Sequence, residues 1–131
     1  MLATMTILSL VAGISDAHRG HQGLRRWVQT YFDTWNRHDA VGLRALLHDD
    51  AALRDWEVEK KGGDAVASAN GAIWQSAPSI AIEVLKTHLT ELTAVCEILV
   101  KVKPGVEPLK VVDVLEFDSD GKIVAVRAYK G

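Results

Sequence analysis

An aspartate interrupts an apolar stretch near the end of the chain, in the run "KVVDVLEF". Asp113 has the same strand parity as Leu115 and Phe117, so alternation predicts that its carboxyl group faces the core or a cavity. A buried carboxyl group has two stable states: ionised beside a cation, for which Arg127 is a candidate, or protonated with a raised pKa. In the second state Asp113 would be a hydrogen-bond donor at neutral pH.

Two further polar groups are predicted to face the same interior. Asp55 has the parity of Leu53 in the run "AALRDW", and Tyr31 lies on the apolar side of a predicted helix, where a buried hydroxyl requires a partner. Three polar groups that face one apolar interior are what a small-molecule proton-transfer site looks like. Each residue alone has an ordinary structural explanation, and it is their joint occurrence that favours a site.

Two helices are predicted in the first part of the chain, and the first of them carries Tyr31. Apolar residues at steps of three, four, seven, eight and eleven predict a helix over residues 24–35: Leu24, Trp27, Val28, Tyr31, Phe32 and Trp35. A second helix follows, with Asp39 as its N-cap and "HDD" as its end. Its buried side is expected to consist of Val41, Leu43, Leu46 and Leu47.

The remaining elements are mostly strands. The expected order is a strand at 51–56, a turn-rich connector "EKKGGD", a helix at 64–74, and long alternating strands at 79–89 and 91–102. Strands at 109–117 and 122–129 then surround "DSDG", a hairpin signal in which Gly121 supplies a positive φ. Helices followed by an antiparallel meander predict an α+β domain, with the helices packed on one face of a curved sheet.

These residues resemble a known family. The segments "WVQTYFDTWNRHDAVGLRALLHDDAALRD" and "VVDVLEFDSDGKIVAVRAYKG" are similar to the opening helices and closing hairpin of SnoaL-like and ketosteroid-isomerase-like proteins of the NTF2-like superfamily. The resemblance implies one such domain at 23–131, preceded by an arm or extra helix at 1–22. It also implies a cone, in which a curved, mostly antiparallel sheet packs on three helices around a pocket, and a homodimer formed through the sheet.

The resemblance also implies roles for the three polar residues. Tyr31 would be the oxyanion tyrosine, Asp55 the general base and Asp113 the protonated acid of an allylic isomerisation through an enolate, without a cofactor. Two positions depart from the isomerases: Trp56 stands where they have proline, and Asn70 stands near a supporting tyrosine. A polyketide-cyclase-like or hydratase-like enzyme using the same pocket, and a non-catalytic ligand-binding or dimerisation module, therefore remain alternatives.

Other residues are candidates for the wall of an apolar ligand pocket. They are Trp35, Trp56, Trp74, His88 and Asn70, although a core position for the tryptophans and a solvated position for His88 explain them equally well. No metal is expected, because "HRGH" lacks a third ligand at a suitable spacing. The single cysteine, Cys96, is expected to be a small buried apolar residue.

Composition restricts the partners and the compartment. A chain of 131 residues with 48% apolar and 24% charged residues is typical of one globular domain. The net charge of −2 and the absence of long Lys/Arg runs argue against nucleic acid. The apolar stretch at 6–14 is too short to span a bilayer and has no preceding Lys or Arg, so cytoplasmic location is favoured over secretion.

Overall fold

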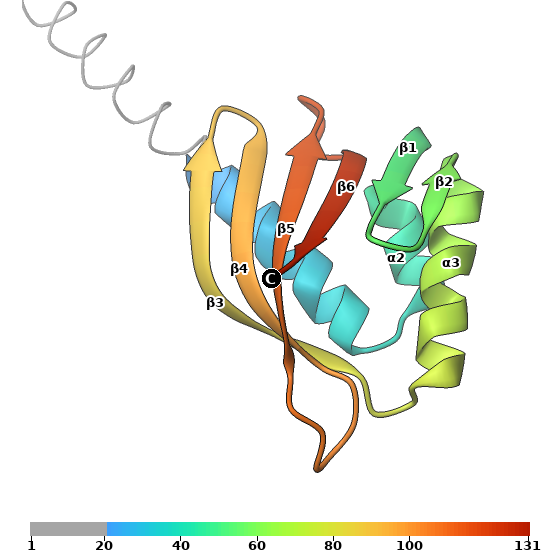
Figure 1. Cartoon of the computed structure of the whole chain (residues 1–131). Helices are drawn as coiled ribbons and strands as arrows, with labels where there is room; N and C mark the ends of the chain where they lie inside the picture. The colour runs from blue at the N-terminus through green and yellow to red at the C-terminus, as the bar shows by residue number, and fades with distance from the viewer. Residues whose placement is uncertain (1–20) are drawn as a thin grey trace, which may run out of the picture.

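The computed structural model describes residues 21–131 (Figure 1). The expected arm at 1–22 and the stretch weighed as a secretion signal therefore lie outside the described residues, apart from residues 21 and 22. Among the helices of the described part, none has both the length and the apolarity needed to cross a membrane.

The first described helix covers residues 21–36 and confirms the predicted period. Its apolar stripe is buried in the core, and Tyr31 lies on that stripe. The end of the helix is fixed to the start of β3 (Ala81–Thr90), because the Asn36 amide donates to the Ile82 carbonyl (2.8 Å) and accepts from the Ile82 N–H (2.7 Å). His38, at a positive φ of 53°, then turns the chain away and contacts the Ile80 carbonyl oxygen through Nε2 (2.8 Å).

The second helix, α2, is shorter than expected and spans Ala40–Leu46. Asp39 caps it as predicted, because its carboxylate accepts from the Gly42 N–H at 2.9 Å. Two details of the prediction are wrong: Val41 is 83% exposed, and the "HDD" run is strand rather than a helix end. Leu47 is buried but begins β1, since its backbone is already extended and pairs with Ile123.

Six strands form one curved sheet in the order β2-β1-β6-β5-β4-β3 (Figure 1). The strands other than β3 are β1 (Leu47–Arg54), β2 (Glu59–Lys61), β4 (Thr93–Lys101), β5 (Leu109–Phe117) and β6 (Ile123–Lys130). The antiparallel meander β3–β6 confirms the prediction, whereas β1 pairs in parallel with β6 and makes the sheet mixed. The supposed connector "EKKGGD" contains β2, because the turn after Arg54 folds the chain back onto β1.

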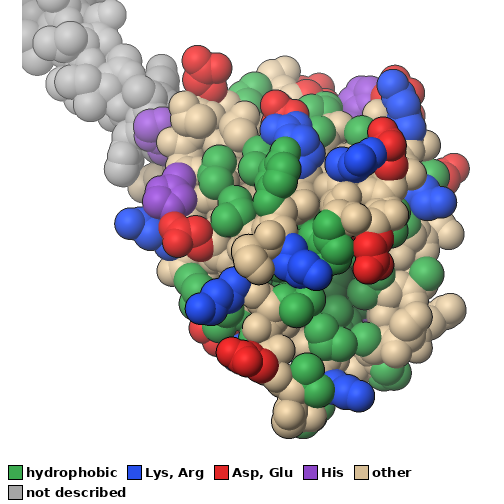
Figure 2. Space-filling model, viewed as in Figure 1, with side chains coloured by type: hydrophobic (Ala, Val, Ile, Leu, Met, Phe, Trp, Pro, Cys, Tyr) green, Lys and Arg blue, Asp and Glu red, His purple; other side chains and the backbone are tan. Residues whose placement is uncertain are grey.

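The two faces of the sheet differ in character. On β5, Val111, Asp113, Leu115 and Phe117 are buried, while the intervening residues are half-buried or exposed, as alternation predicted. We call the face that carries these buried residues the inner face and the opposite one the outer face. The helix 21–36 passes behind the strands in Figure 1, and Figure 2 shows that on the outer face hydrophobic side chains alternate with charged ones.

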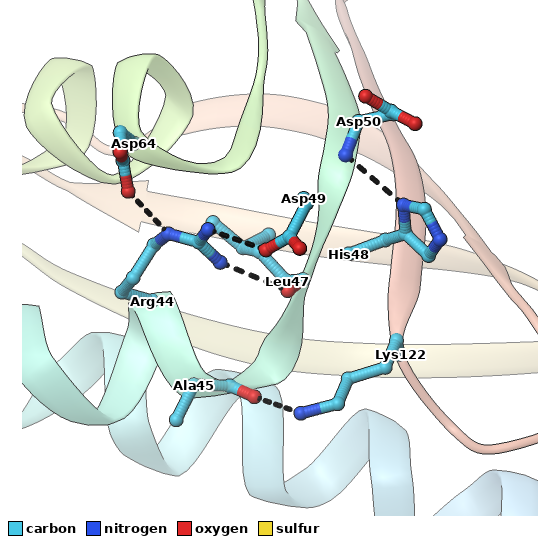
Figure 3. Close-up of polar contacts among 8 residues, drawn as sticks. All are labelled: Arg44, Ala45, Leu47, His48, Asp49, Asp50, Asp64 and Lys122. Carbon is cyan, nitrogen blue, oxygen red and sulfur yellow. Dashed lines mark hydrogen bonds and ion pairs between the residues drawn. The ribbon is translucent and has the colours of Figure 1, made fainter.

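The third helix, α3 (Gly63–Ser76), is fixed at its start by Arg44. The Arg44 guanidinium donates to Asp64 (2.6 Å), Asp49 (2.7 Å) and the Leu47 carbonyl oxygen (3.1 Å), and thereby joins α2, β1 and α3 (Figure 3). Gly63 is required there, because a Cβ atom would lie 2.6 Å from the Arg44 Cζ and 2.8 Å from a backbone oxygen of His48. This junction holds α3 against the same side of the sheet as the helix 21–36.

Candidate functional site

A cavity of about 260 Å³ lies between the inner face of the sheet, the helix 21–36 and α3. Its wall is mostly apolar, with side chains from β4 and β5 such as Ile98, Val100, Leu109 and Val111. The polar groups that reach it include Tyr31, Asp55 and Asp113, so the three residues predicted from the sequence share one cavity although they come from separate elements. Pockets of this kind, apolar with a few convergent polar groups, are typical of small-molecule sites.

Asp113 is the most deeply buried acid of this cavity, with 5% of its surface exposed. Within the described residues it makes no ion pair and no hydrogen bond, and its cross-strand neighbour on β4 is the neutral Cys96. Burial, and then the charge of Asp55, raise the pKa of Asp113 from its ordinary value to about 7. A large fraction of Asp113 is therefore protonated at neutral pH and can donate a hydrogen bond.

Asp55 lies at the end of β1, where the strand turns toward β2. Its Oδ1 accepts from the backbone N–H groups of Glu57 (2.7 Å) and Val58 (2.6 Å), which fixes the orientation of the carboxylate. Because Oδ1 is occupied by these two bonds, Oδ2 is the oxygen left for other chemistry. Asp55 is thus an oriented, partly exposed base beside a buried acid.

Tyr31 brings its hydroxyl to the cavity from the middle of the helix 21–36. Burial, followed by the nearby Asp113 and Cys96, raises the pKa of Tyr31 above its ordinary value, so the phenol stays protonated. Burial is also the largest cause that raises the pKa of Cys96 to about 11, and it keeps the thiol neutral. Tyr31 is therefore a neutral donor at neutral pH.

The cations that could have neutralised these acids are used elsewhere. Arg127, the candidate partner of Asp113, donates to Glu116 at 2.7 Å on the outer face. Arg54 pairs with Glu59 on β2. Among the described residues that line the cavity there is no Lys, Arg or His, so neither carboxyl group is paired with a protein cation.

Of the five residues considered for the pocket wall, the structure brings three to the cavity. They are Trp35, Trp56 and Asn70. The Trp35 indole N–H donates to the Asn70 side chain at 2.8 Å, and the Asn70 amide donates to the Val66 carbonyl oxygen, so Asn70 orients Trp35 rather than Tyr31. Trp56, which is 42% exposed, lies at the mouth under Lys130, whose Nζ is 5.4 Å from its ring centroid.

The other two candidates do not line the cavity. Trp74 packs behind Trp35 (ring centroids 5.6 Å apart) and stacks on His38 at 5.3 Å. His88 points to the outer face and pairs with Glu97 at 2.7 Å. The strand register explains this correction, since Thr87 rather than His88 is paired with the inward-facing Cys96.

The cavity also has members that the sequence did not single out. Glu57 and Val58 reach its mouth because the chain reverses direction after Arg54. The alternating pattern had predicted instead that the strand continues through Trp56. Short Asp-capped turns of this kind carry little signal in one sequence. Ile98, Val100 and Val102 were detectable, because they share one parity in the alternating strand predicted at 91–102.

Comparison with known proteins gives this arrangement a context. Residues 28–126 match the family described as SnoaL-like domain. In a search of curated proteins, none matches the chain.

Similar solved structures share the architecture at low sequence identity. An NTF2-like protein of unknown function from Cytophaga hutchinsonii superposes with a TM-score of 0.71 at 9% identity, over 82% of this chain and 89% of that one. A candidate isomerase of the SnoaL-like family from Agrobacterium tumefaciens gives 0.70 at 15% identity (81% and 95%). A candidate polyketide cyclase from Sinorhizobium meliloti gives 0.71 at 21% identity (79% and 93%). The expected α+β fold is confirmed: within the described residues an open, curved, mixed sheet packs on three helices, and the NTF2-like protein from Cytophaga hutchinsonii shares this fold.

Proposed function

The chain belongs to the SnoaL-like domain family, and from this premise we propose that it is a cofactor-independent enzyme that moves a proton on a small apolar carbonyl compound. The specific reaction proposed is an allylic isomerisation through an enolate, as in ketosteroid isomerases. One observation carries the proposal: Asp55, Tyr31 and Asp113 open onto one apolar cavity, and no described side chain that lines it is a cation.

Asp55 is the base of the proposed reaction. With Oδ1 held by two backbone N–H groups, its Oδ2 removes a proton from the carbon next to the substrate carbonyl. The carboxylate is oriented before substrate arrives, which reduces the entropy lost at the transition state. Asp55 then returns the proton to the γ carbon, and the double bond moves into conjugation.

Tyr31 and Asp113 stabilise the enolate. Negative charge develops on the carbonyl oxygen when the proton leaves, and two neutral donors in a low-dielectric cavity stabilise that charge. Asp113 can do so only while protonated, and its pKa of about 7 means that this donor is lost as the pH rises above neutrality. The proposed activity should therefore decline through this range because the Asp113 donor is lost.

Exchange of the α protons of a simple ketone tests the proposal without knowledge of the natural substrate. Cyclohexanone is incubated in deuterated buffer, and loss of its α-proton signal is followed by NMR. The protein should accelerate exchange over buffer, and Asp55→Asn should reduce the rate by about 10²- to 10⁴-fold, the usual contribution of a general base. The amide oxygen introduced by this substitution can still accept from the two N–H groups, so the turn is retained.

Glu97→Gln is the matched control, because Glu97 is a carboxylate on the outer face, paired with His88. Its exchange rate should equal that of the original chain. The absence of protein-dependent exchange would overturn the proposed enzyme, and unchanged exchange in Asp55→Asn would remove Asp55 from the mechanism.

A non-catalytic ligand-binding module is the second candidate, and one observation favours it. In the described residues, the Tyr31 hydroxyl has no hydrogen-bonded support, since Asn70 bonds to Trp35 instead. A binding module would take up cyclohexanone without exchanging its protons. A cyclase or hydratase using the same cavity would instead retain a requirement for Asp55 with a different substrate.

We also propose that the protein is a cytoplasmic homodimer that associates through the outer face. On this face Leu85 and Tyr129 are 55% and 57% exposed, and with Leu99 and Val112 they line a hollow of about 340 Å³. Exposed apolar groups of this kind favour a protein partner. Sedimentation equilibrium should give twice the chain mass, and Leu85→Lys should shift it toward the monomer; a monomer at all concentrations would exclude this arrangement.

A further inference from the structure

The charges around the cavity suggest which ligands it can hold. Its lining includes the carboxyl groups of Asp55, Asp113 and Glu57, and no cationic side chain among the described residues. Lys130 lies over the ring of Trp56, with its Nζ 5.4 Å from the ring centroid, and is not part of the cavity wall. A ligand inside the cavity therefore meets carboxyl groups in the wall and no cationic side chain there.

We propose that this cavity selects its ligand by charge, accepting small apolar molecules that are uncharged or carry a protonated amine and excluding those that carry a carboxylate. This charge selection rests on the proposed function in one respect only, namely that the ligand binds in this cavity. A carboxylate would be held next to Asp55 in a poorly hydrated space, where like charges repel strongly. A protonated amine would supply the cation that both carboxyl groups lack, and the rings of Tyr31, Trp35 and Trp56 would favour it further.

Asp113 sets the balance between the two accepted classes. In its protonated form it donates to a carbonyl oxygen, and in its ionised form it attracts an ammonium group. The groups that face it are Tyr31 from the helix 21–36, Cys96 from β4, and Asp55 and Glu57 from the turn after β1. The facing residues of β6 and α3 include Ala128, Val126, Asn70 and Ile73, none of which titrates. Since Tyr31 and Cys96 stay neutral, Asp113 is the group whose charge changes near neutral pH.

Three ligands of matched shape test the inference: cyclohexanone, cyclohexylammonium and cyclohexanecarboxylate. Their dissociation constants are measured by NMR titration of the folded chain at about pH 6 and about pH 8. The ammonium ion should bind about tenfold more tightly at the higher pH, because the ionised fraction of Asp113 rises through its pKa of about 7. The affinity for cyclohexanone should fall by up to about the same factor between the lower and the higher pH. The carboxylate should bind at least about tenfold more weakly than cyclohexanone at both pH values.

Variants on one strand supply the controls. Asp113→Asn should remove both pH dependences and leave the ketone bound, whereas Glu116→Gln, on the opposite face of the same strand, should preserve them. Carboxylate binding equal to that of the ketone, parallel pH dependences for ketone and ammonium, or no binding of any of the three would overturn the inference. Because the readout is binding, a failure of proton exchange alone would refute the proposed enzyme and leave charge selection standing.

Discussion

Asp113 and Glu116 lie three residues apart on β5 and have opposite surroundings. Glu116 faces outward and accepts from Arg127 at 2.7 Å, and the other outer-face acids Glu83 and Glu97 likewise pair with Lys101 and His88. Asp113 faces inward and, within the described residues, has no partner. The same sheet therefore pairs these acids of its outer face with basic side chains and leaves Asp113, on its inner face, unpaired.

This difference indicates that Asp113 does not serve to stabilise the folded state. An exposed pair such as Glu116–Arg127 contributes little to stability and needs no further explanation. A buried, unpaired carboxyl group lowers the stability of the folded state at neutral pH, because its charged form is poorly solvated there. Its presence is therefore not explained by stability and is better explained by the cavity that it lines.

The largest predicted effect is on the pH dependence of stability. The pKa of Asp113 is raised in the folded state. Between about pH 4 and about pH 7 the folded chain therefore retains a proton that the unfolded chain has already lost. The free energy of unfolding therefore falls as the pH rises through this window, by up to about 1.4 kcal/mol per unit and about 4 kcal/mol in total. Asp113→Asn lacks this loss and should be more stable than the original chain by about that amount near pH 8.

Urea unfolding of both chains at a series of pH values provides the measurement. The difference between them should be small near pH 4 and should grow toward neutrality, while all other titrating groups cancel in the comparison. A difference that stays constant with pH would mean that Asp113 titrates normally. In that case it is not the protonated donor of the proposed site.

The two tyrosines of the chain give the second prediction, which separates the faces by activity. Tyr31 lines the cavity, whereas Tyr129 is exposed on the outer face beside Arg127. Tyr31→Phe should reduce ketone α-proton exchange by about 10²- to 10³-fold, the usual loss for one oxyanion donor, and Tyr129→Phe should leave it unchanged. Equal rates in the two variants would show that the phenol of Tyr31 takes no part.

The fold could be predicted from this sequence because periodicity in it is strong. The apolar stripe from Leu24 to Trp35 is compatible only with a helix, and the alternation along β5 is compatible only with a strand buried on one face. The errors occurred where local signals were weak. The register of β1 depends on pairing with β6, a contact between residues about 75 positions apart that no local pattern reports, and β2 consists of the charged residues "EKK".

The site was predictable in part for the same reason. Parity identified the inward direction of Asp113, and helical spacing identified Tyr31, whereas Asp55 reaches the cavity from the turn after β1 rather than from a strand. By contrast, the pairing of Arg127 with Glu116 rather than Asp113, the capping of Asp55 by two N–H groups and the outward direction of His88 depend on strand register and turn geometry. These follow from tertiary structure, which the sequence alone did not supply.

The smallest predicted effect concerns the acid that has a partner. Glu116→Gln removes a half-exposed ion pair with Arg127, and exposed pairs are worth about 0.2–1 kcal/mol. Urea unfolding should therefore show a loss of at most about 1 kcal/mol that shrinks at high salt, with unchanged proton exchange and ligand binding. A loss of exchange comparable to that in the Tyr31 or Asp55 variants would mean that the two faces are coupled through β5. The contrast between a paired outer face and an unpaired inner one would then no longer separate structure from function, because both acids would influence the cavity.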